Sequence, residues 1–402
     1  MSADTEKILK PGAALPPVPF APSRETDPAA YARGTAPSVS AKFRVEPQSL
    51  PPGAAMTVRA QGPDGISVPA TAAALSGGEA VLQETACSGT FPGTVKYYSK
   101  DGKGGAPAFK LDWEASLDGG STWAPAGETR HTVYVTLAQP HPTALKHETL
   151  YYIGCRYAAG ETTVAGMTSS VWDHFAARDV RRVDGVQLTY YNSYNTEVMT
   201  TADLLAYGDG QCGSWARFFL DTLKIHGFRE AENFVLFKPS LLFEEEGGFI
   251  VKNWTFSGDG WFGGVAGMLH PYLNIPSYPL VGSTQYNWLF KEVNYTSGTA
   301  GQGNAKPAAL FGNHQVAFVQ GKYYDPSYGQ TFATLQDIDN GALDGFWMID
   351  EWDLDESELD VDIDGDGGKT DWVRTPIFLF RKNPAGLDLK EYLLPNGKRI
   401  TY

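Results

Sequence analysis

The stretch Tyr207–Gly227, YGDGQCGSWARFFLDTLKIHG, decides how the chain is expected to fold. Asp209 suits the N-cap of a helix, and Gly227 suits the position just past its end. Small or apolar residues recur between them at the spacing of one helix face: Cys212, Trp215, Ala216, Phe219, Leu220 and Leu223. The pattern therefore predicts a core helix whose first turn carries Cys212 beneath a glycine-rich loop.

A cysteine at that place has a specific chemical use. The unpaired N–H groups and the positive dipole end of a helix N-terminus stabilise a thiolate, the form of cysteine that attacks carbonyl carbons. Gly210 and Gly213 leave room for a substrate backbone to approach. The alternative is a small buried thiol that packs like an alanine.

The stretch Phe311–Gly329, FGNHQVAFVQGKYYDPSYG, adds a histidine and a carboxylate. Apolar residues on both sides of Gly321 indicate two short strands, and this glycine suits a two-residue hairpin loop. That loop makes Asp325 the diagonal neighbour of His314 on one face, within reach of an imidazole–carboxylate contact. One residue more or less in the loop would put the two side chains on opposite faces. An ordinary surface hairpin is the alternative.

The order Cys, His, Asp, with the cysteine opening a helix and the others on successive strands, resembles the transglutaminase-like superfamily. The matching segments are GQCGSWA with the helix that follows it to HGF, and NHQVAFVQGKYYDPSYG. The resemblance covers residues 169–328. It implies an α+β, papain/transglutaminase-like domain in which the helix bearing the cysteine packs on an antiparallel sheet. It assigns Cys212 as nucleophile, His314 as base and Asp325 as the group that orients the base.

The resemblance further implies cysteine-dependent acyl transfer on an amide bond of a protein or peptide substrate, through a thioester. Bacterial members are the better match, because Gly-Ser separates Cys212 from the next tryptophan, whereas in the animal cross-linking enzymes a tryptophan follows the cysteine directly. Hydrolysis by a peptidase or amidase is therefore favoured slightly over a cross-linking transglutaminase. A catalytically silent binding or scaffold protein with a calcium-stabilised fold of this type is the alternative from another class. No cofactor is expected for catalysis.

Several other residues are candidates for a part in the site. Gln211 and, by analogy with the animal enzymes, Trp172 are candidate oxyanion donors beside the Cys212 backbone N–H. His174 is the rival base, although no hairpin carboxylate lies near it in the sequence. His226 is excluded because fourteen residues of helix would place it about 21 Å from Cys212.

The chain is expected to contain three parts. Residues 1–40 are rich in proline and alanine and predict a tail or linker. In residues 41–140, apolar and polar residues alternate in short stretches separated by glycine-rich turns. This pattern predicts an all-β, immunoglobulin-like sandwich suited to docking a partner. Residues 141–402 form the catalytic domain, with a long insertion at 240–310 that we expect to make a wall or lid of the cleft. Its candidate residues, with one that follows it, are Trp254, Trp261, Gly301, Gln302 and Asn313.

An acidic segment, residues 350–371, contains a calcium-loop pattern, DVDIDGDGGKTD. Carboxylates at alternate positions followed by a glycine and a terminal acid suit Ca²⁺, although aspartate replaces the usual bidentate glutamate. An acidic, solvated loop is the alternative. The candidate metal ligands are Asp360, Asp362, Asp364, Asp366 and Asp371.

Composition limits the remaining possibilities. The net charge of −14 argues against nucleic acid as a partner of the whole surface, and no stretch is apolar enough to span a membrane. Three cysteines exclude a disulfide framework, and they leave open either one Cys87–Cys155 bridge or two buried free thiols. No secretory signal is visible; the localisation stays open, with export favoured over the cytoplasm.

Overall fold

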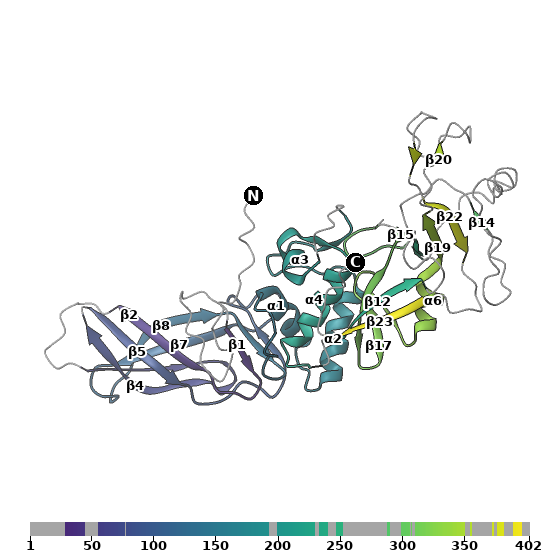
Figure 1. Cartoon of the computed structure of the whole chain (residues 1–402). Helices are drawn as coiled ribbons and strands as arrows, with labels where there is room; N and C mark the ends of the chain where they lie inside the picture. Colours follow the sequence, from purple (N-terminus) through teal and green to yellow (C-terminus); the bar gives the residue numbers. More distant parts are fainter. Residues whose placement is uncertain are drawn as a thin grey trace. The chain divides into compact units, whose positions relative to one another are not determined.

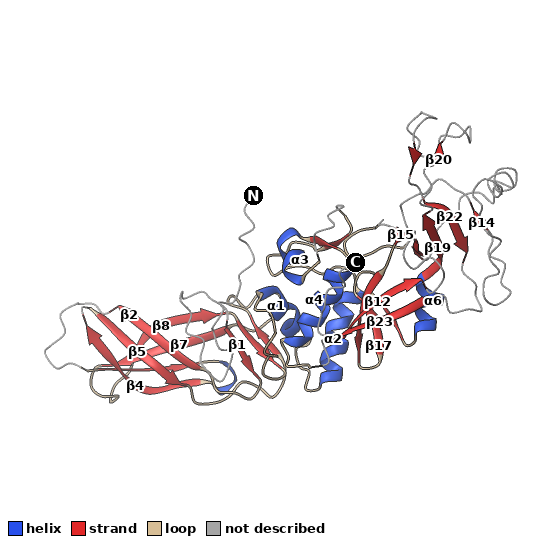
Figure 2. Ribbon diagram, in the orientation of Figure 1, coloured by secondary structure: helices blue, strands red, loops and turns tan. Residues whose placement is uncertain are grey.

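The chain forms several sheets and few helices, so it is an α+β protein (Figures 1 and 2). This computed structural model describes residues 29–44, 55–76, 78–192, 199–229, 233–239, 247–251, 288–289, 299–305, 307, 310–349, 354–355, 372–373, 376–381 and 389–395. The chain divides into two compact units. The first comprises Met1–Phe175, Arg181–Val186 and Phe218–Ala231, and the second comprises Ala176–Val180, Gln187–Arg217 and Glu232–Tyr402.

Two sheets make up the β part of the first unit. One has the order β2-β5-β4-β3-β7-β8 with antiparallel neighbours, and the other has the order β1-β9-β6. Buried side chains from both sheets join in one hydrophobic cluster that includes Val58, Trp113 and Val135. The strands are β1 (Ala29–Ala32), β2 (Ser38–Arg44), β3 (Met56–Gln61), β4 (Ser67–Ser76), β5 (Glu79–Ala86), β6 (Lys96–Tyr98), β7 (Phe109–Ser116), β8 (Ala124–His131) and β9 (Val133–Thr136).

Residues 29–32 and 38–40 lie in the strands β1 and β2, which corrects the prediction of a tail that extends to residue 40. β1 pairs in parallel with β9, and the Arg33 N–H donates to the Thr136 carbonyl at 2.9 Å. Tyr31 is only 6% exposed and lies in the hydrophobic cluster. The alanine- and proline-rich composition predicted no core here, but β1 buries Ala30, Tyr31 and Ala32 and pairs with β9 along its whole length.

Two helices, α1 (Glu148–Tyr157) and α2 (Val164–Ala176), follow the sheets. α1 packs on the small sheet, where the Tyr134 hydroxyl donates to the Glu148 carboxylate at 3.0 Å and the Tyr97 and Tyr152 rings meet edge to face. The first compact unit thus continues past the predicted boundary near residue 140, as far as Phe175.

His226 is a buried histidine of the first unit and lies just past the end of α4 (Cys212–Lys224). Its Nδ1 accepts a hydrogen bond from the Leu137 N–H at 3.1 Å. A Cβ atom at Gly154 would come within 2.7 Å of Nε2, so the ring fills space that only glycine leaves. Burial lowers the pKa of His226 to about 3, although a hydrogen bond with the Gly154 backbone opposes the shift.

This pKa makes stability fall in acid. The unfolded imidazole takes up a proton near pH 6.5 while the folded one stays neutral to about pH 3, so stability is lost as the pH falls between these values. Urea unfolding of the wild type should show a slope of up to about 1.4 kcal/mol per pH unit from this group. His226→Gln should flatten that slope, whereas His141→Gln, at a more exposed site, should not. Equal slopes in all three proteins would contradict this role of His226.

The second unit contains two five-stranded antiparallel sheets, with the orders β18-β17-β16-β12-β23 and β14-β22-β19-β13-β15. Among the described residues of this unit, the helices are α3 (Thr201–Tyr207), α6 (Leu335–Ala342) and the first residues of α4, Cys212–Arg217. The strands are β10 (Thr189–Tyr190), β11 (Asp209–Gly210), β12 (Asn233–Pro239), β13 (Gly247–Val251), β14 (Trp288–Leu289), β15 (Leu310–Phe311), β16 (His314–Val319), β17 (Lys322–Asp325), β18 (Gln330–Phe332), β19 (Leu343–Ile349), β20 (Leu354–Asp355), β21 (Trp372–Val373), β22 (Pro376–Arg381) and β23 (Leu389–Pro395).

All three cysteines are free and buried, so the two-thiol alternative holds in this structure and the Cys87–Cys155 bridge is not formed. Burial raises the pKa of Cys87 to about 11 and that of Cys155 well above its usual value.

In the part of the chain that is described, no helix combines the length and the hydropathy needed to cross a bilayer.

Candidate active site

Cys212 is the first residue of α4 and is 5% exposed. The short strands β10 and β11 lead into it, with Tyr190 paired in parallel with Gly210. A Cβ atom at Gly210 would lie 2.3 Å from the Ser214 Oγ, so glycine lets the loop pass close against the first helical turn. The predicted position of the cysteine at a helix N-terminus, behind a glycine, is confirmed.

The predicted cap of this helix is wrong. Asp209 lies in β11, and its Oδ1 accepts hydrogen bonds from the Thr189 hydroxyl at 2.7 Å and the Asn192 N–H at 3.1 Å. Sequence patterns did not predict the two strand residues of β11, which lie between α3 and α4. Gly227 does follow the helix with a φ of +79°, as predicted. The predicted apolar face is buried throughout: Cys212, Trp215, Ala216, Phe219, Leu220 and Leu223.

The predicted hairpin is also confirmed. β16 and β17 are joined by Gln320 and Gly321, whose φ values of 51° and 76° match a two-residue type I′ turn. Val319 pairs with Lys322, which is the register that a two-residue loop requires. His314 begins the first strand and Asp325 ends the second, so their side chains reach the same end of the hairpin.

The His314 Nε2 lies 2.8 Å from the Asp325 Oδ2. The second carboxylate oxygen, Oδ1, accepts the Ser327 N–H at 3.1 Å. The Asp325 side chain is 4% exposed and that of His314 is 14% exposed. Both oxygens of Asp325 are therefore engaged, which fixes the carboxylate and, through it, the plane of the imidazole.

The start of β16 lies against the first turn of α4. A Cβ atom at Gly213 would come within 2.3 Å of the Gln315 Oε1, so the side chain next to His314 covers the residue next to Cys212. The Cys212 sulfur is close enough to His314 to contribute, by hydrogen bonding and by charge, to the pKa of the imidazole. These contacts bring the three predicted catalytic residues into one group.

The electrostatics of this group favour a protonated imidazole. Burial lowers the pKa of His314, but the charge and hydrogen bond of Asp325, with smaller contributions from Cys212, raise it to about 10. Because Nε2 faces Asp325, Nδ1 is the nitrogen that remains for Cys212. Nδ1 is buried and has no hydrogen-bond partner of ordinary geometry among the described residues. The histidine is thus held as a cation at neutral pH with one N–H still to donate.

Aromatic rings surround the histidine, and the sequence did not identify them. The ring centroids of Phe311 and Tyr328 lie 5.7 and 5.9 Å from that of His314, and Tyr190 packs edge to face on Tyr328 at 5.2 Å. Burial raises the pKa values of Tyr190 and Tyr328 well above the ordinary range, so both hydroxyls stay protonated. Tyr328 could have been found from its place three residues after Asp325, whereas nothing near Tyr190 in the sequence indicated a contact with it.

Gly301 and Gln302 pack beneath the turn that follows Asp325. Gln302 is fully buried; its backbone N–H donates to the Ser327 carbonyl at 2.9 Å, and its Nε2 donates to the Pro326 carbonyl at 2.8 Å. A Cβ atom at Gly301 would lie 2.7 Å from the Tyr190 ring. These two residues, predicted to belong to a wall or lid of the cleft, therefore lie in a buried, hydrogen-bonded segment that supports the turn after Asp325.

Gln302→Ala should therefore destabilise the protein and impair the site. The change leaves the buried Pro326 carbonyl without its donor, at a cost of about 1–3 kcal/mol. Urea unfolding should show this loss, while Gln330→Ala, an exposed glutamine on β18, should stay within about 0.5 kcal/mol of the wild type. Equal stability of the two variants would show that Gln302 does not support the turn.

The other predicted site residues lie beside Cys212 or His314 in the sequence, in the first unit, or outside the described residues. Asn313 is half-buried and immediately precedes His314, and Gln211 immediately precedes Cys212, with its carbonyl accepting from the Ser214 hydroxyl at 2.8 Å. Trp172 belongs to the first unit, where it packs edge to face on Phe219. The cleft candidates Trp254 and Trp261 and the calcium candidates lie outside the described residues: Asp360, Asp362, Asp364, Asp366 and Asp371.

The rival histidine, His174, stacks on Tyr157 with ring centroids 3.6 Å apart, in the first unit.

No protein-family model and no curated protein matches the chain.

Proposed function

We propose that this protein is a cysteine-dependent acyl-transfer enzyme of the transglutaminase-like type. In this proposal the second unit has a papain/transglutaminase-like core, and the two sheets of the first unit form an immunoglobulin-like sandwich. The observation that carries the proposal is the buried contact between His314 and Asp325 beside the helix turn that begins with Cys212. A nucleophile, a base and a group that orients the base are the three parts that this chemistry needs.

The first half of the reaction forms a thioester. The Cys212 sulfur, as a thiolate paired with the His314 cation, attacks the carbonyl carbon of an amide. The oxygen of the tetrahedral intermediate accepts hydrogen bonds from the Cys212 backbone N–H and a neighbouring donor, for which Gln211 is the nearest predicted residue. The His314 Nδ1–H then protonates the leaving amine as the C–N bond breaks.

The second half regenerates the enzyme. Water or a second amine attacks the thioester carbonyl, the neutral His314 Nδ1 accepts its proton, and the C–S bond breaks to release the thiolate. Water as the acceptor gives hydrolysis, and a lysine amine gives a cross-link. Hydrolysis remains the favoured outcome because of the Gly-Ser pair after Cys212, and the substrate is a protein or peptide.

Mass spectrometry tests the proposal on a pool of candidate peptides and proteins, incubated with the wild type and with Cys212→Ala. Hydrolysis should appear as cleavage or deamidation that depends on Cys212, and transamidation as cross-linked peptides. Identical product patterns for the two proteins, with both folded, would reject the enzymatic proposal.

A further inference from the structure

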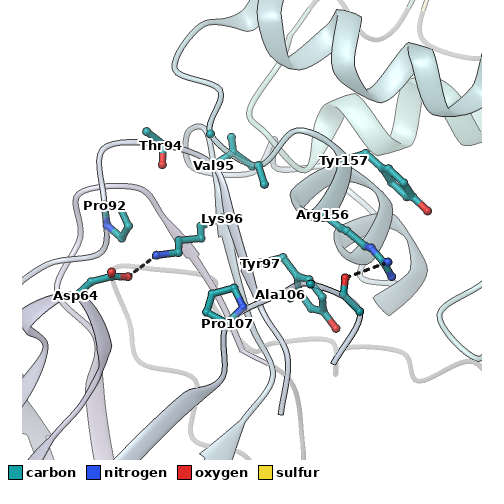
Figure 3. A pocket seen from close by; sticks show the side chains of 14 residues that line it. Asp64, Pro92, Thr94, Val95, Lys96, Tyr97, Ala106, Pro107, Arg156 and Tyr157 are labelled. Carbon is teal, nitrogen blue, oxygen red and sulfur yellow. Dashed lines mark hydrogen bonds and ion pairs between the residues drawn. The ribbon is translucent and has the colours of Figure 1, made fainter. Parts of the chain in front are cut away.

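The first unit contains a pocket that the proposed chemistry does not use (Figure 3). Its volume of about 540 Å³ falls in the range of small-ligand sites. Three chain segments line it: residues 92–97, the glycine-rich turn 104–107, and the end of α1 with the residues that follow it, 156–160. Asp64 completes the lining.

The charges of this pocket do not cancel. Lys96 and Arg156 are its cations and Asp64 is its carboxylate, which leaves one positive charge. The Lys96 Nζ lies 2.8 Å from the Asp64 Oδ2, so these two neutralise each other. Figure 3 shows this pair apart from Arg156, so the uncompensated charge belongs to Arg156.

Arg156 is held in place without a carboxylate partner among the described residues. Its guanidinium donates to the Gly104 carbonyl at 3.4 Å and to the Tyr152 hydroxyl. It also lies over two aromatic rings, 5.1 Å from the centre of Tyr152 and 5.7 Å from that of Tyr157. Half-buried and fixed by these contacts, the guanidinium can meet a carboxylate in the two-pronged geometry that arginine favours.

From these features we propose that the pocket binds a short peptide segment through one carboxylate, either of a side chain or of a C-terminus. A monoanion matches the single positive charge, whereas a doubly charged phosphate would be left partly unneutralised beside Asp64. Pro92 and Pro107, which are not buried, give the pocket apolar surface against which a peptide can pack. The inference that the ligand is a peptide rests on the proposed function. The inference that it carries a carboxylate rests on Arg156 and the charge of the pocket.

The test measures binding to the full chain carrying Cys212→Ala, so that the probe is not turned over and the result is independent of catalysis. The probe is a coumarin-labelled pentapeptide, Ala-Ala-Glu-Ala-Ala, which has a side-chain and a C-terminal carboxylate. It is compared with its C-terminally amidated glutamine counterpart, which has neither, with its phosphoserine counterpart, and with sodium galacturonate as a competitor. We expect saturable binding of the glutamate peptide. Arg156→Gln should weaken it at least about tenfold, as expected for loss of a charged hydrogen bond.

Two further variants complete the experiment. Ala106→Trp should block the pocket without removing any charge, and Arg130→Gln, on β8 outside the pocket, should leave binding unchanged. A melting curve for each variant separates unfolding from loss of the site. No saturable binding, binding to the Arg156→Gln and Ala106→Trp variants as tight as to the parent protein, equal binding of the glutamate and glutamine peptides, or a preference for the phosphoserine peptide or galacturonate would overturn the proposal.

Discussion

Cys212→Ala is expected to abolish turnover, with a fall of about 10⁴-fold or more, because the proposed thioester forms on the Cys212 sulfur. The variant should fold normally, since alanine keeps the apolar packing of a thiol that is 5% exposed at the start of α4. Product formation by mass spectrometry and a thermal melt measure the two quantities.

Cys87→Ala is the matched control for this change. Cys87 is also buried, but it lies in the first unit, where its environment raises its pKa to about 11 and so disfavours a thiolate. Its replacement should leave turnover unchanged. Turnover by Cys212→Ala at the wild-type rate would remove the nucleophile from the proposal.

Asp325→Asn is expected to lower turnover by about 10²–10⁴-fold and to change its pH dependence. In the wild type the pKa of His314 is about 10, so the imidazolium and its proton for the leaving amine persist well above neutral pH. Without the charge of Asp325, burial is left to lower that pKa. The alkaline limb of the pH–rate profile should therefore move to lower pH in the variant.

The raised pKa of His314 also makes the free energy of unfolding depend on pH. Because the pKa of His314 is higher in the folded state than its usual 6.5, its contribution is complete below about pH 6.5 and is lost as the pH rises to about 10. The stability advantage of the wild type over Asp325→Asn should shrink across that range. Asp179→Asn, at an exposed site in the same unit, should alter neither profile; a pH-independent difference for Asp325→Asn would show that Asp325 does not set the charge of His314.

Sequence patterns correctly predicted those parts of the site that depend on residues close together in the chain. The helix period placed Cys212 at the start of α4, and a two-residue loop fixed the register that brings His314 to Asp325. Both depend on residues that are neighbours in sequence, where turn chemistry and side-chain period leave few alternatives.

The parts that sequence reasoning missed depend on distant pairings. Tyr190 and Gln302 reach the site because the Gln302 carbonyl accepts the Tyr190 N–H at 2.8 Å, a contact between segments more than a hundred residues apart. Asp209 was predicted to be a helix cap because the pairing of β11 with β10 cannot be read from either segment alone. The alanine-rich β1 was missed for the same reason, since its partner β9 lies far along the chain.

The most direct test of the central claim is the rate at which iodoacetamide alkylates each cysteine at pH 6, followed by mass spectrometry of the labelled peptides. Cys87 and Cys155 serve as internal standards, because burial raises both of their pKa values. If His314 holds Cys212 as a thiolate, Cys212 should react roughly 10²-fold faster than either standard and should lose that advantage in His314→Ala. Equal, slow labelling of all three thiols in the folded protein would contradict the account.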